Sequence, residues 1–536
     1  PGFGGTVRSV RLLGVRVAME MMLTGRSLRA DKALKLGLVD RLVPTRDALA
    51  DAARELIRSA PPPRRPAWYE RALSWAPLRP WIKRQLLRQV SRRVRAEHYP
   101  APYALIELWA RHGARGPQSF EAEARSIAEL FATPTARNLI RVFLLQDRFK
   151  GRAARAQAAI RHVHVIGAGV MGGDIAAWCA QRGLEVTLQD RELRFVEAAL
   201  QRARQQFEKR YRAGQRVAET MARLRADIAG DGVPQADVVI EAIFENVDAK
   251  RSLYAQLEPR LQRTAVLATN TSSIMIEVLA EKLADPGRLI GLHFFNPVAQ
   301  MPLLEIVQGR TTAPAMLEPA LAFARKIDKI PLPCASAPGF VVNRVLVPYL
   351  FEALHAAGEG VALPLIDRCM EEFGMPMGPV ELADVVGLDV CLHVGDIVSR
   401  ALARTPPDLA PLRALVEAKK LGRKSGEGFY RWQDGKAVKP AVTGSAPADL
   451  QDRLVLALLN ECVALLREGV VDSVDAVDTG VVFGAGFAPF RGGPLHYARQ
   501  RGVSDCVNRL KELAARYGPR FEPDPAWDRI AETTQS

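Results

Sequence analysis

One short stretch constrains the fold more than any other part of this chain. The β-branched run 162–166 ends directly in Gly167-Ala168-Gly169-Val170-Met171-Gly172, and a helical pattern follows over Ala176–Arg182. Strand, G-x-G-x-x-G and helix in this order form the context in which such glycines bind a dinucleotide. A second apolar run, 185–190, completes a βαβ unit, so we expect parallel strands joined by a crossover helix.

Three further apolar runs extend this pattern along the chain. Val238–Ala242, Ala265–Ala268 and Leu289–His293 read as buried strands, and helical patterns separate them. Strands that alternate with helices build a parallel sheet covered on both faces. The sequence therefore predicts an α/β Rossmann fold, a doubly wound parallel sheet, over this part of the chain.

The glycines have separate expected roles in the turn. Gly167 makes the tight turn, Gly169 lets a pyrophosphate approach the backbone, and Gly172 allows close packing of the helix. The helix that opens at Val170 and Met171 offers free N–H groups and a positive dipole end to the phosphates. The alternative is an ordinary glycine turn without a ligand.

Asp190 ends the second strand and predicts which dinucleotide binds. A carboxylate at this position accepts hydrogen bonds from the ribose hydroxyls and repels a 2′-phosphate, which favours NAD. Arg191 follows directly and could meet a 2′-phosphate, so NADP stays open as an alternative.

Length and composition limit the class of protein. A chain of 536 residues needs several cores, since domains have roughly 100 to 200 residues. Its 48% hydrophobic and 25% charged residues are ordinary globular values. No apolar run reaches the roughly 20 residues of a membrane span, and no signal peptide is evident, so we expect no transmembrane segment.

The cysteines and the net charge say less about function. Six cysteines are scattered without metal-ligand spacing, so neither a disulfide framework, nor a metal site, is indicated and a reducing cytoplasm fits best. The net charge of +15 would attract an anion such as coenzyme A, which carries three phosphates. Solvated basic faces explain the same charge equally well, and we expect no nucleic-acid partner.

Five regions follow from the pattern along the chain. Region 1–45 begins with a glycine-dense turn and continues as helix, turn, helix and a short strand near 37–39. It looks cut from a larger domain, so we expect an upstream part to be missing. A helical linker region, 46–158, includes a linker candidate at 61–66. The dinucleotide-binding domain is expected at 159–337. Two helical copies, 338–436 and 437–536, follow because Asn343–Glu352 is echoed by Asp452–Glu461.

From about Arg161 onward the chain resembles the 3-hydroxyacyl-CoA dehydrogenase family. The order and spacing of several motifs carry this resemblance. They are Glu241-Ala242-Ile243-Phe244-Glu245-Asn246, Asn270-Thr271-Ser272-Ser273, Gly291-Leu292-His293-Phe294-Phe295-Asn296-Pro297, Met301-Pro302-Leu303-Leu304-Glu305-Ile306-Val307 and Pro338-Gly339-Phe340-Val341-Val342-Asn343-Arg344. The resemblance implies NAD-dependent oxidation of (3S)-3-hydroxyacyl-CoA to 3-ketoacyl-CoA in fatty-acid β-oxidation, by a dinucleotide domain followed by helices.

The resemblance also implies the catalytic residues. His293 matches the general base and Glu305 the acid that orients it, a pairing that suits imidazole chemistry near neutral pH. Asn343 matches an amide that contacts the reacting oxygen, and Thr269 stands where the family usually has Ser. Without the resemblance, His293 reads as a hydrogen-bonded core residue and Asn343 as a helix cap.

Three more residues are expected at the cofactor. Glu245 and Lys250 match positions near the cofactor ribose and the coenzyme A moiety, although a solvated helix face explains such a charged pair as well. Asn270, in the motif that follows Thr269, completes the expected cofactor-binding set.

The front end resembles a different family. Residues 1–8, 23–26 and 33–39 are similar to the end of an enoyl-CoA hydratase domain of the crotonase type. With the duplicated helical part, this makes the chain resemble bacterial and peroxisomal multifunctional enzymes of fatty-acid oxidation. Two alternatives to a self-sufficient dehydrogenase remain. The chain could be a fragment of a bifunctional hydratase and dehydrogenase, or a non-catalytic scaffold for a thiolase. The paired glutamates of a hydratase are expected upstream, so this polypeptide is not expected to hydrate enoyl-CoA.

Overall fold

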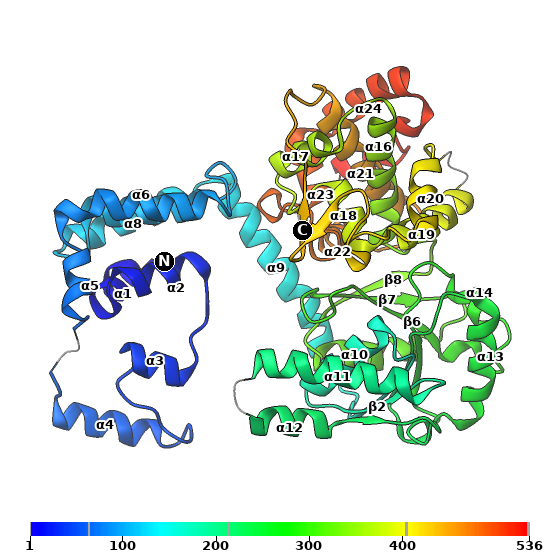
Figure 1. Cartoon of the computed structure of the whole chain (residues 1–536), viewed down its shortest axis with the longest axis horizontal. Helices are drawn as coiled ribbons and strands as arrows, with labels where there is room; N and C mark the ends of the chain where they lie inside the picture. The colour runs from blue at the N-terminus through cyan, green and yellow to red at the C-terminus, as the bar shows by residue number, and fades with distance from the viewer. Residues whose placement is uncertain (1, 63–64, 212–213, 403–405, 533–536) are drawn as a thin grey trace. The chain divides into compact units, whose positions relative to one another are not determined.

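The computed structural model describes residues 2–62, 65–211, 214–402 and 406–532, and part of the linker candidate at 61–66 lies outside them. The chain divides into two compact units, Pro1–Ile140 and Arg141–Ser536. The division falls inside one long helix, α9 (Pro134–Ala154), which connects them (Figure 1). Each unit is described by itself.

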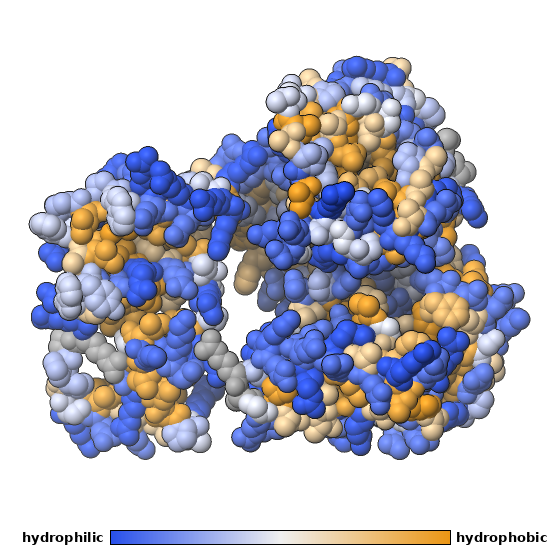
Figure 2. Space-filling model, viewed as in Figure 1, coloured by the Kyte–Doolittle hydropathy of each residue, from blue (hydrophilic) through white to orange (hydrophobic). Residues whose placement is uncertain are grey.

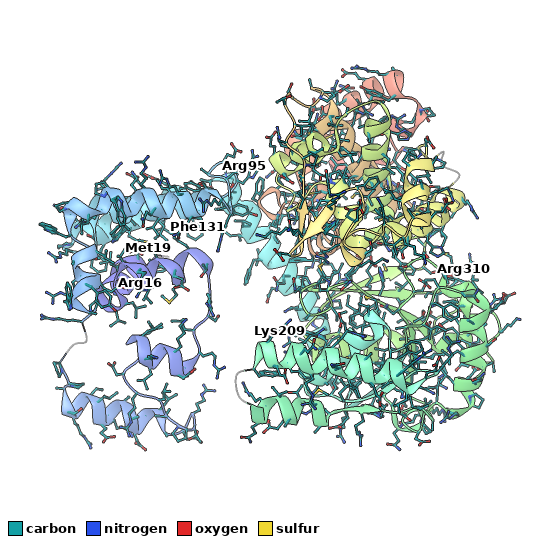
Figure 3. The ribbon with its side chains drawn as sticks, viewed as in Figure 1. Arg16, Met19, Arg95, Phe131, Lys209 and Arg310 are labelled. Atoms are coloured by element: carbon teal, nitrogen blue, oxygen red, sulfur yellow. The ribbon has the colours of Figure 1, made fainter. Side chains whose placement is uncertain are left out.

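The first unit is helical in its described residues. Its core lies among α1, α2 and α7, where Val7, Met19 and Trp109 are buried. Figure 3 labels Met19 and Arg16, neighbours on α2. The bounds of its helices before α9 are α1 Gly5–Leu13, α2 Val15–Thr24, α3 Ala30–Leu36, α4 Leu49–Ser59, α5 Trp68–Leu73, α6 Arg79–Ser91, α7 Pro100–His112 and α8 Gln118–Phe131.

One local expectation for the first unit changes. The short strand predicted after Leu36 is wrong, because Gly37 ends α3 in the left-handed conformation and the N–H of Leu38 turns back to the carbonyl of Ala33. Further along, α7 begins at Pro100, where proline fits because the first helical N–H needs no partner.

The second unit contains an eight-stranded sheet in the order β3-β2-β1-β4-β5-β6-β7-β8. Every neighbouring pair is parallel except β6 and β7, which run antiparallel. The strands are β1 His162–Ile166, β2 Glu185–Gln189, β3 Leu224–Ala226, β4 Val238–Glu241, β5 Val266–Thr269, β6 Leu289–Phe294, β7 Leu303–Gln308 and β8 Ile330–Ala335.

The central strands explain why the sheet forms. All residues of β4, β5 and β6 are buried, as expected for strands covered by helices on both faces. The predicted doubly wound fold is confirmed, but the sheet is mixed rather than wholly parallel. A short connection between β6 and β7 makes them an antiparallel pair, because a parallel return needs a longer crossover.

Helices flank this sheet on both faces (Figure 1). Their alternation with the strands follows the predicted βαβ order. They are α10 Val170–Gln181, α11 Leu193–Arg210, α12 Gly214–Ala222, α13 Val247–Leu257, α14 Ile276–Ala280 and α15 Leu317–Lys326.

A helical region follows the sheet. Its two longest helices, α16 and α21, pack against each other and form much of the second unit's core. A small hairpin of β9 (Arg431–Gln433) and β10 (Lys436–Val438) interrupts the helices. These helices are α16 Val342–Gly358, α17 Leu363–Phe373, α18 Pro379–Val386, α19 Leu388–Ala401, α20 Ala410–Glu417, α21 Leu450–Arg467, α22 Val474–Gly484, α23 Pro494–Arg501, α24 Val503–Tyr517 and α25 Trp527–Glu532.

Buried ion pairs join α16 and α21 in a reciprocal arrangement. Arg344 on α16 binds Glu461 of α21 at 2.6 Å, and Arg453 on α21 binds Glu352 of α16 at 2.6 Å. All four side chains are at most 2% exposed. Each arginine also reaches a second, more exposed glutamate on the partner helix.

The same interval of sequence separates Arg344 from Arg453 and Glu352 from Glu461. Reciprocal contacts of this kind are expected where two equivalent helices cross about a pseudo-twofold axis. The arrangement supports the internal duplication that the sequence predicts.

We expect the variant Arg453→Met to lose substantial stability. Methionine fills the space but leaves the buried Glu352 with only the more exposed Arg520 as a cation, and breaking a buried ion pair costs about 3–5 kcal/mol. Thermal unfolding should show a clear drop in Tm. Arg431→Met is the control, because that side chain is 85% exposed and its Tm should stay near wild type. Equal Tm values for both variants would contradict the assigned role of the pair.

Candidate active site

The glycine turn lies between β1 and α10 and has the geometry that a dinucleotide needs. Gly167 has φ of +104°, and a Cβ there would lie 2.5 Å from the carbonyl oxygen of Ala242. A Cβ on Gly172 would lie 1.8 Å from the oxygen of Gly167. Nothing lies within 4 Å of a Cβ built on Gly169. The turn therefore needs two of its glycines for its own shape and leaves the third facing open space.

The start of α10 is open for a ligand. Val170 is 59% exposed and Met171 half-buried, so the first N–H groups of the helix are not covered by packed side chains. Unpaired N–H groups and the positive end of the helix dipole attract phosphate. The residues present fit the pyrophosphate of a dinucleotide.

Asp190 holds the glycine turn through its carboxylate. Its carboxylate accepts from the main-chain N–H of Ala168 at 2.6 Å and of Arg191 at 2.7 Å. The side chain thus reaches back from the end of β2 to the first turn, which ties the two parts of the predicted fingerprint together.

Two alanine variants separate the roles of the glycines. We expect Gly172→Ala to lower both Tm and NADH affinity, because the new Cβ must displace the backbone of Gly167. Gly169→Ala should keep its Tm, since its Cβ meets nothing, yet lose NADH affinity because the methyl occupies the path of the pyrophosphate. Fluorescence titration with NADH and thermal unfolding measure both. Unchanged NADH affinity in Gly169→Ala would contradict the proposed approach of the phosphates.

His293 and Glu305 face each other on adjacent antiparallel strands. They are register partners on β6 and β7, and Nδ1 of His293 lies 2.6 Å from Oε2 of Glu305. The histidine is 5% exposed and the glutamate is fully buried. A carboxylate at this distance accepts the Nδ1 proton and leaves the lone pair on Nε2. No described residue provides a hydrogen bond to Nε2.

Aromatic rings fix the plane of the imidazole. The ring of Phe295 lies 4.5 Å from that of His293, and the ring of Phe340 lies 5.7 Å away, both edge-on. Rings packed edge-on restrict rotation of the imidazole and exclude water from its sides. The two phenylalanines also flank the histidine from different segments of the chain.

Glu305 connects this pair to the start of α16. Its Oε1 accepts from the main-chain N–H of Val341 at 3.1 Å and of Val342 at 2.9 Å. Asn343 is the next residue, and its amide donates to the carbonyl of Ser272 at 3.1 Å. The structure therefore brings the predicted base, its acid and the predicted substrate amide into one neighbourhood.

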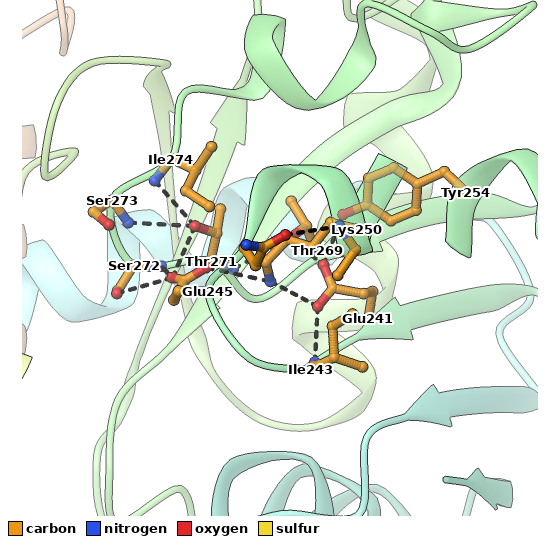
Figure 4. A network of polar contacts seen from close by, with 12 residues as sticks. Glu241, Ile243, Glu245, Lys250, Tyr254, Thr269, Thr271, Ser272, Ser273 and Ile274 are labelled. Atoms are coloured by element: carbon orange, nitrogen blue, oxygen red, sulfur yellow. Dashed lines mark hydrogen bonds and ion pairs between the residues drawn. The ribbon is translucent and has the colours of Figure 1, made fainter. Parts of the chain in front are cut away.

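A second buried carboxylate, Glu241, lies at the end of β4 and organises the adjacent loops (Figure 4). It accepts from the Lys250 ammonium at 2.7 Å, the Tyr254 hydroxyl at 2.6 Å, the Thr269 hydroxyl at 2.8 Å and the main-chain N–H of Ile243 at 2.8 Å. The sequence analysis did not assign Glu241 a role. An acid at the end of an otherwise apolar strand was the signal that could have found it.

Thr269 is fully buried and directs its hydroxyl proton to Glu241. Its oxygen also accepts from the main-chain N–H of Thr271 at 3.3 Å. The methyl group that distinguishes Thr from Ser adds bulk beside this network. Its expected role at the substrate stays a prediction.

The remaining predicted cofactor residues lie on the loops around this network. Oε1 of Glu245 accepts from Ser272 N–H at 2.7 Å, and its Oε2 lies 3.3 Å from Lys250. Burial raises the pKa of Glu245, but the Lys250 charge and the hydrogen bonds from Ser272 and Thr271 outweigh it, so the pKa is lowered. The carboxylate therefore stays ionised and can accept from a ribose hydroxyl.

Asn270 plays a structural part beside any contact with the cofactor. Its side-chain oxygen accepts from the main-chain N–H of Phe294 at 2.9 Å, directly after His293. Asn270 thus ties the end of β5 to the end of β6. Its side chain is half-buried, so part of it can still meet a ligand.

Lys329 is a buried cation that the sequence analysis missed. It is 3% exposed, binds the carbonyl oxygens of Val298 and Met301, and lies 4.6 Å from the ring centre of Trp178. Burial lowers the pKa of Lys329 to about 8. Its contacts fix the loop that follows Phe295, and no local pattern in the sequence distinguishes it from a surface lysine.

Together the fold and this geometry define a class of protein, a NAD-dependent dehydrogenase, in which a histidine and a glutamate form a buried pair. Residues 162–337 match the family model described as 3-hydroxyacyl-CoA dehydrogenase, NAD binding domain, and residues 339–432 match the C-terminal domain of the same family. The chain belongs to the 3-hydroxyacyl-CoA dehydrogenase family. The predicted cofactor, NAD, and the predicted enzyme class are confirmed by these matches.

The solved structures that are similar to this chain include two 3-hydroxybutyryl-CoA dehydrogenases. A 3-hydroxybutyryl-CoA dehydrogenase from Escherichia coli K12 is 28% identical, covers 70% of this chain and 98% of its own, and has a TM-score of 0.61. The (S)-3-hydroxybutyryl-CoA dehydrogenase of Ralstonia eutropha is 35% identical over 52% of this chain and 100% of its own, with a TM-score of 0.49.

Two other matches concern the front end and the architecture. Residues 1–63 match the enoyl-CoA hydratase/isomerase family model, in line with the predicted resemblance of this part. The dehydrogenase part of multifunctional enzyme 1 from C. elegans is 23% identical, covers 74% of this chain and 99% of its own, and has a TM-score of 0.51, which shows a shared fold. Within the described residues, no helix combines the length and apolarity needed to span a membrane.

Proposed function

We propose that this chain oxidises (3S)-3-hydroxyacyl-CoA to 3-ketoacyl-CoA with NAD, and that His293 is the general base. The 2.6 Å contact between Nδ1 of His293 and the buried Glu305 is the observation that supports this best. It leaves Nε2 as the basic atom, in a site that also contains the amide of Asn343.

The proposed chemistry divides between the protein and its cofactor. When bound, NAD would supply the acceptor for the hydride that leaves the carbon carrying the 3-hydroxyl. Nε2 of His293 takes the hydroxyl proton, and Glu305 stabilises the imidazolium that results. The amide of Asn343 orients the reacting oxygen, while Glu245 and Asp190 accept from ribose hydroxyls of the cofactor. Phe295 and Phe340 exclude water beside the imidazole.

The wider setting follows from the chemistry of the product. A 3-ketoacyl-CoA is the substrate of a thiolase, so we propose a place in fatty-acid β-oxidation, in the bacterial cytoplasm, with a thiolase as a possible downstream partner. Mixing the chain with a thiolase from the same source and testing for co-elution in size-exclusion chromatography examines the partnership. Elution of the two proteins at their separate volumes would count against it.

The match of residues 1–63 favours a second candidate, a protein that combines hydratase and dehydrogenase activities. We also propose that 437–536 is a second copy of the helical domain at 338–436, since the reciprocal ion pairs of α16 and α21 relate the two segments. Sequencing the coding region on both sides of this segment tests the bifunctional candidate, which needs two glutamates in a hydratase frame.

We expect His293→Ala to abolish turnover while keeping NADH bound. Without the imidazole no group in this neighbourhood takes or returns the proton, and general acid–base catalysis contributes roughly 10²–10⁴-fold to rate. The assay mixes the protein with acetoacetyl-CoA and NADH and follows the absorbance of the reduced nicotinamide. NADH binding by fluorescence is the control for folding. Full turnover in His293→Ala would show that the assignment of the base is wrong.

Glu305→Gln tests the orienting role separately. The amide NH₂ group can no longer accept the Nδ1 proton, so the imidazole is driven to the tautomer with its proton on Nε2 and cannot act as a base. We expect kcat to fall by roughly two to four orders of magnitude with KM for acetoacetyl-CoA little changed. A variant that changes KM alone would assign Glu305 to substrate binding instead.

A further inference from the structure

A polar cavity of about 360 Å³ lies among α10, α11, α12 and the start of β3, away from the residues discussed above. It is the size of ordinary small-molecule pockets. Figure 3 labels Lys209 on α11, the residue before Arg210 of the cavity wall, and Figure 2 shows a mostly hydrophilic surface over α11. Its wall is formed by Gln181, Arg182, Arg210, Tyr211, Arg216, Glu219, Thr220 and Arg223.

The charge of this wall is unbalanced. Four arginines face one glutamate, and that glutamate, Glu219, is exposed and accepts from Gln215 at 3.0 Å. Arg182 is paired outside the cavity with Asp328 at 2.8 Å. Among the described residues, Arg210, Arg216 and Arg223 have no carboxylate partner within 4 Å.

Two buried donors in the same wall also lack an acceptor. Nε2 of Gln181 and Nε of Arg182 are inaccessible to solvent and have no hydrogen-bond partner among the described residues. A buried donor without a partner costs free energy, and so do like charges gathered around one cavity. An anion seated among the four arginines offsets the charges that the wall gathers.

This cavity is separate from the dinucleotide site. Gln181 is the last residue of α10, whereas the glycine turn precedes its first residue, Val170. The helix has 12 residues, which corresponds to about 18 Å of length. Arg223 precedes β3, so the cavity lies at the amino edge of the sheet and the cofactor at the carboxyl edge.

We propose that this cavity binds a small anion with more than one phosphate group, at a second site independent of the dehydrogenase reaction. Planar guanidinium groups match phosphate oxygens with paired N–H donors, and several arginines at once require several anionic oxygens. Tyr211 lies in the same wall, and its hydroxyl group can act as a neutral donor beside the arginines.

Calorimetric titration of the whole chain, saturated with NAD, with sodium pyrophosphate tests this site. NAD occupies the glycine turn, so heat from that turn is excluded. We expect one saturable event, and a rise in Tm with pyrophosphate concentration as ligand linkage requires. Absence of saturable binding would overturn the proposal. Sodium acetate at the same concentrations should give no saturable event, and equal affinity for acetate would overturn selectivity for phosphate.

Paired variants locate the binding event. Arg216→Gln with Arg223→Gln removes two charges from the wall, and we expect pyrophosphate affinity to fall roughly tenfold or more. Arg204→Gln with Arg225→Gln removes two charges from α11 and β3 outside the wall and should bind as wild type. If both double variants lost the same pyrophosphate affinity, net charge alone would explain the effect and the proposed site would be wrong. NADH affinity, measured in each, verifies folding.

Discussion

The buried carboxylate of Glu305 is the interaction on which the active site depends. A charge fully removed from water is costly unless donors surround it, and here the donors come from two separate parts of the chain. One is the imidazole of His293 on the neighbouring strand, and the others are the main-chain N–H groups of Val341 and Val342 at the start of α16. The contacts that stabilise the buried carboxylate therefore also hold the start of the helical region against the sheet. Because Asn343 follows directly, the same contacts also place its amide, which we propose orients the substrate, in the neighbourhood of His293.

The helical region buries charges in both copies, but only the first copy places the start of its long helix beside Glu305. Arg344 and Arg453 each neutralise buried glutamates of the opposite helix, which explains why both long helices retain charges in an apolar core. The residue before Arg453 is Asp452, the counterpart of Asn343 in the second copy. Asp452 is ion-paired with two arginines of α23 and α24 rather than turned toward any strand. The second copy thus serves as a packing partner for the first, as the other subunit would in a homodimer.

The sequence predicted the parts of this structure that depend on local chemistry. The turn at Gly167, the acid at Asp190 and the strand ending at His293 were all found, because period, spacing and the special backbone of glycine are written in neighbouring residues. The antiparallel β7, the short β3 and the orientation of Thr269 toward Glu241 were not. Those features depend on which strands and side chains come into contact in the folded chain. Such long-range contacts cannot be predicted from a single sequence. The arginine cavity is of the second kind, since its wall comes from three helices with the residues that end them and from Arg223, which precedes β3.

Two buried glutamates on neighbouring parts of the sheet have opposite consequences for chemistry. Glu241 accepts four donors, including the ammonium of Lys250, so its charge is fully used inside the protein and cannot act on a ligand. Among the described residues, no lysine or arginine pairs with Glu305, and the side chain that hydrogen-bonds to it is the imidazole of His293. A proton gained at His293 therefore creates the cation that Glu305 lacks. In the proposed reaction the imidazolium that forms at His293 lies against Glu305, whereas Glu241 serves to hold the adjacent loops.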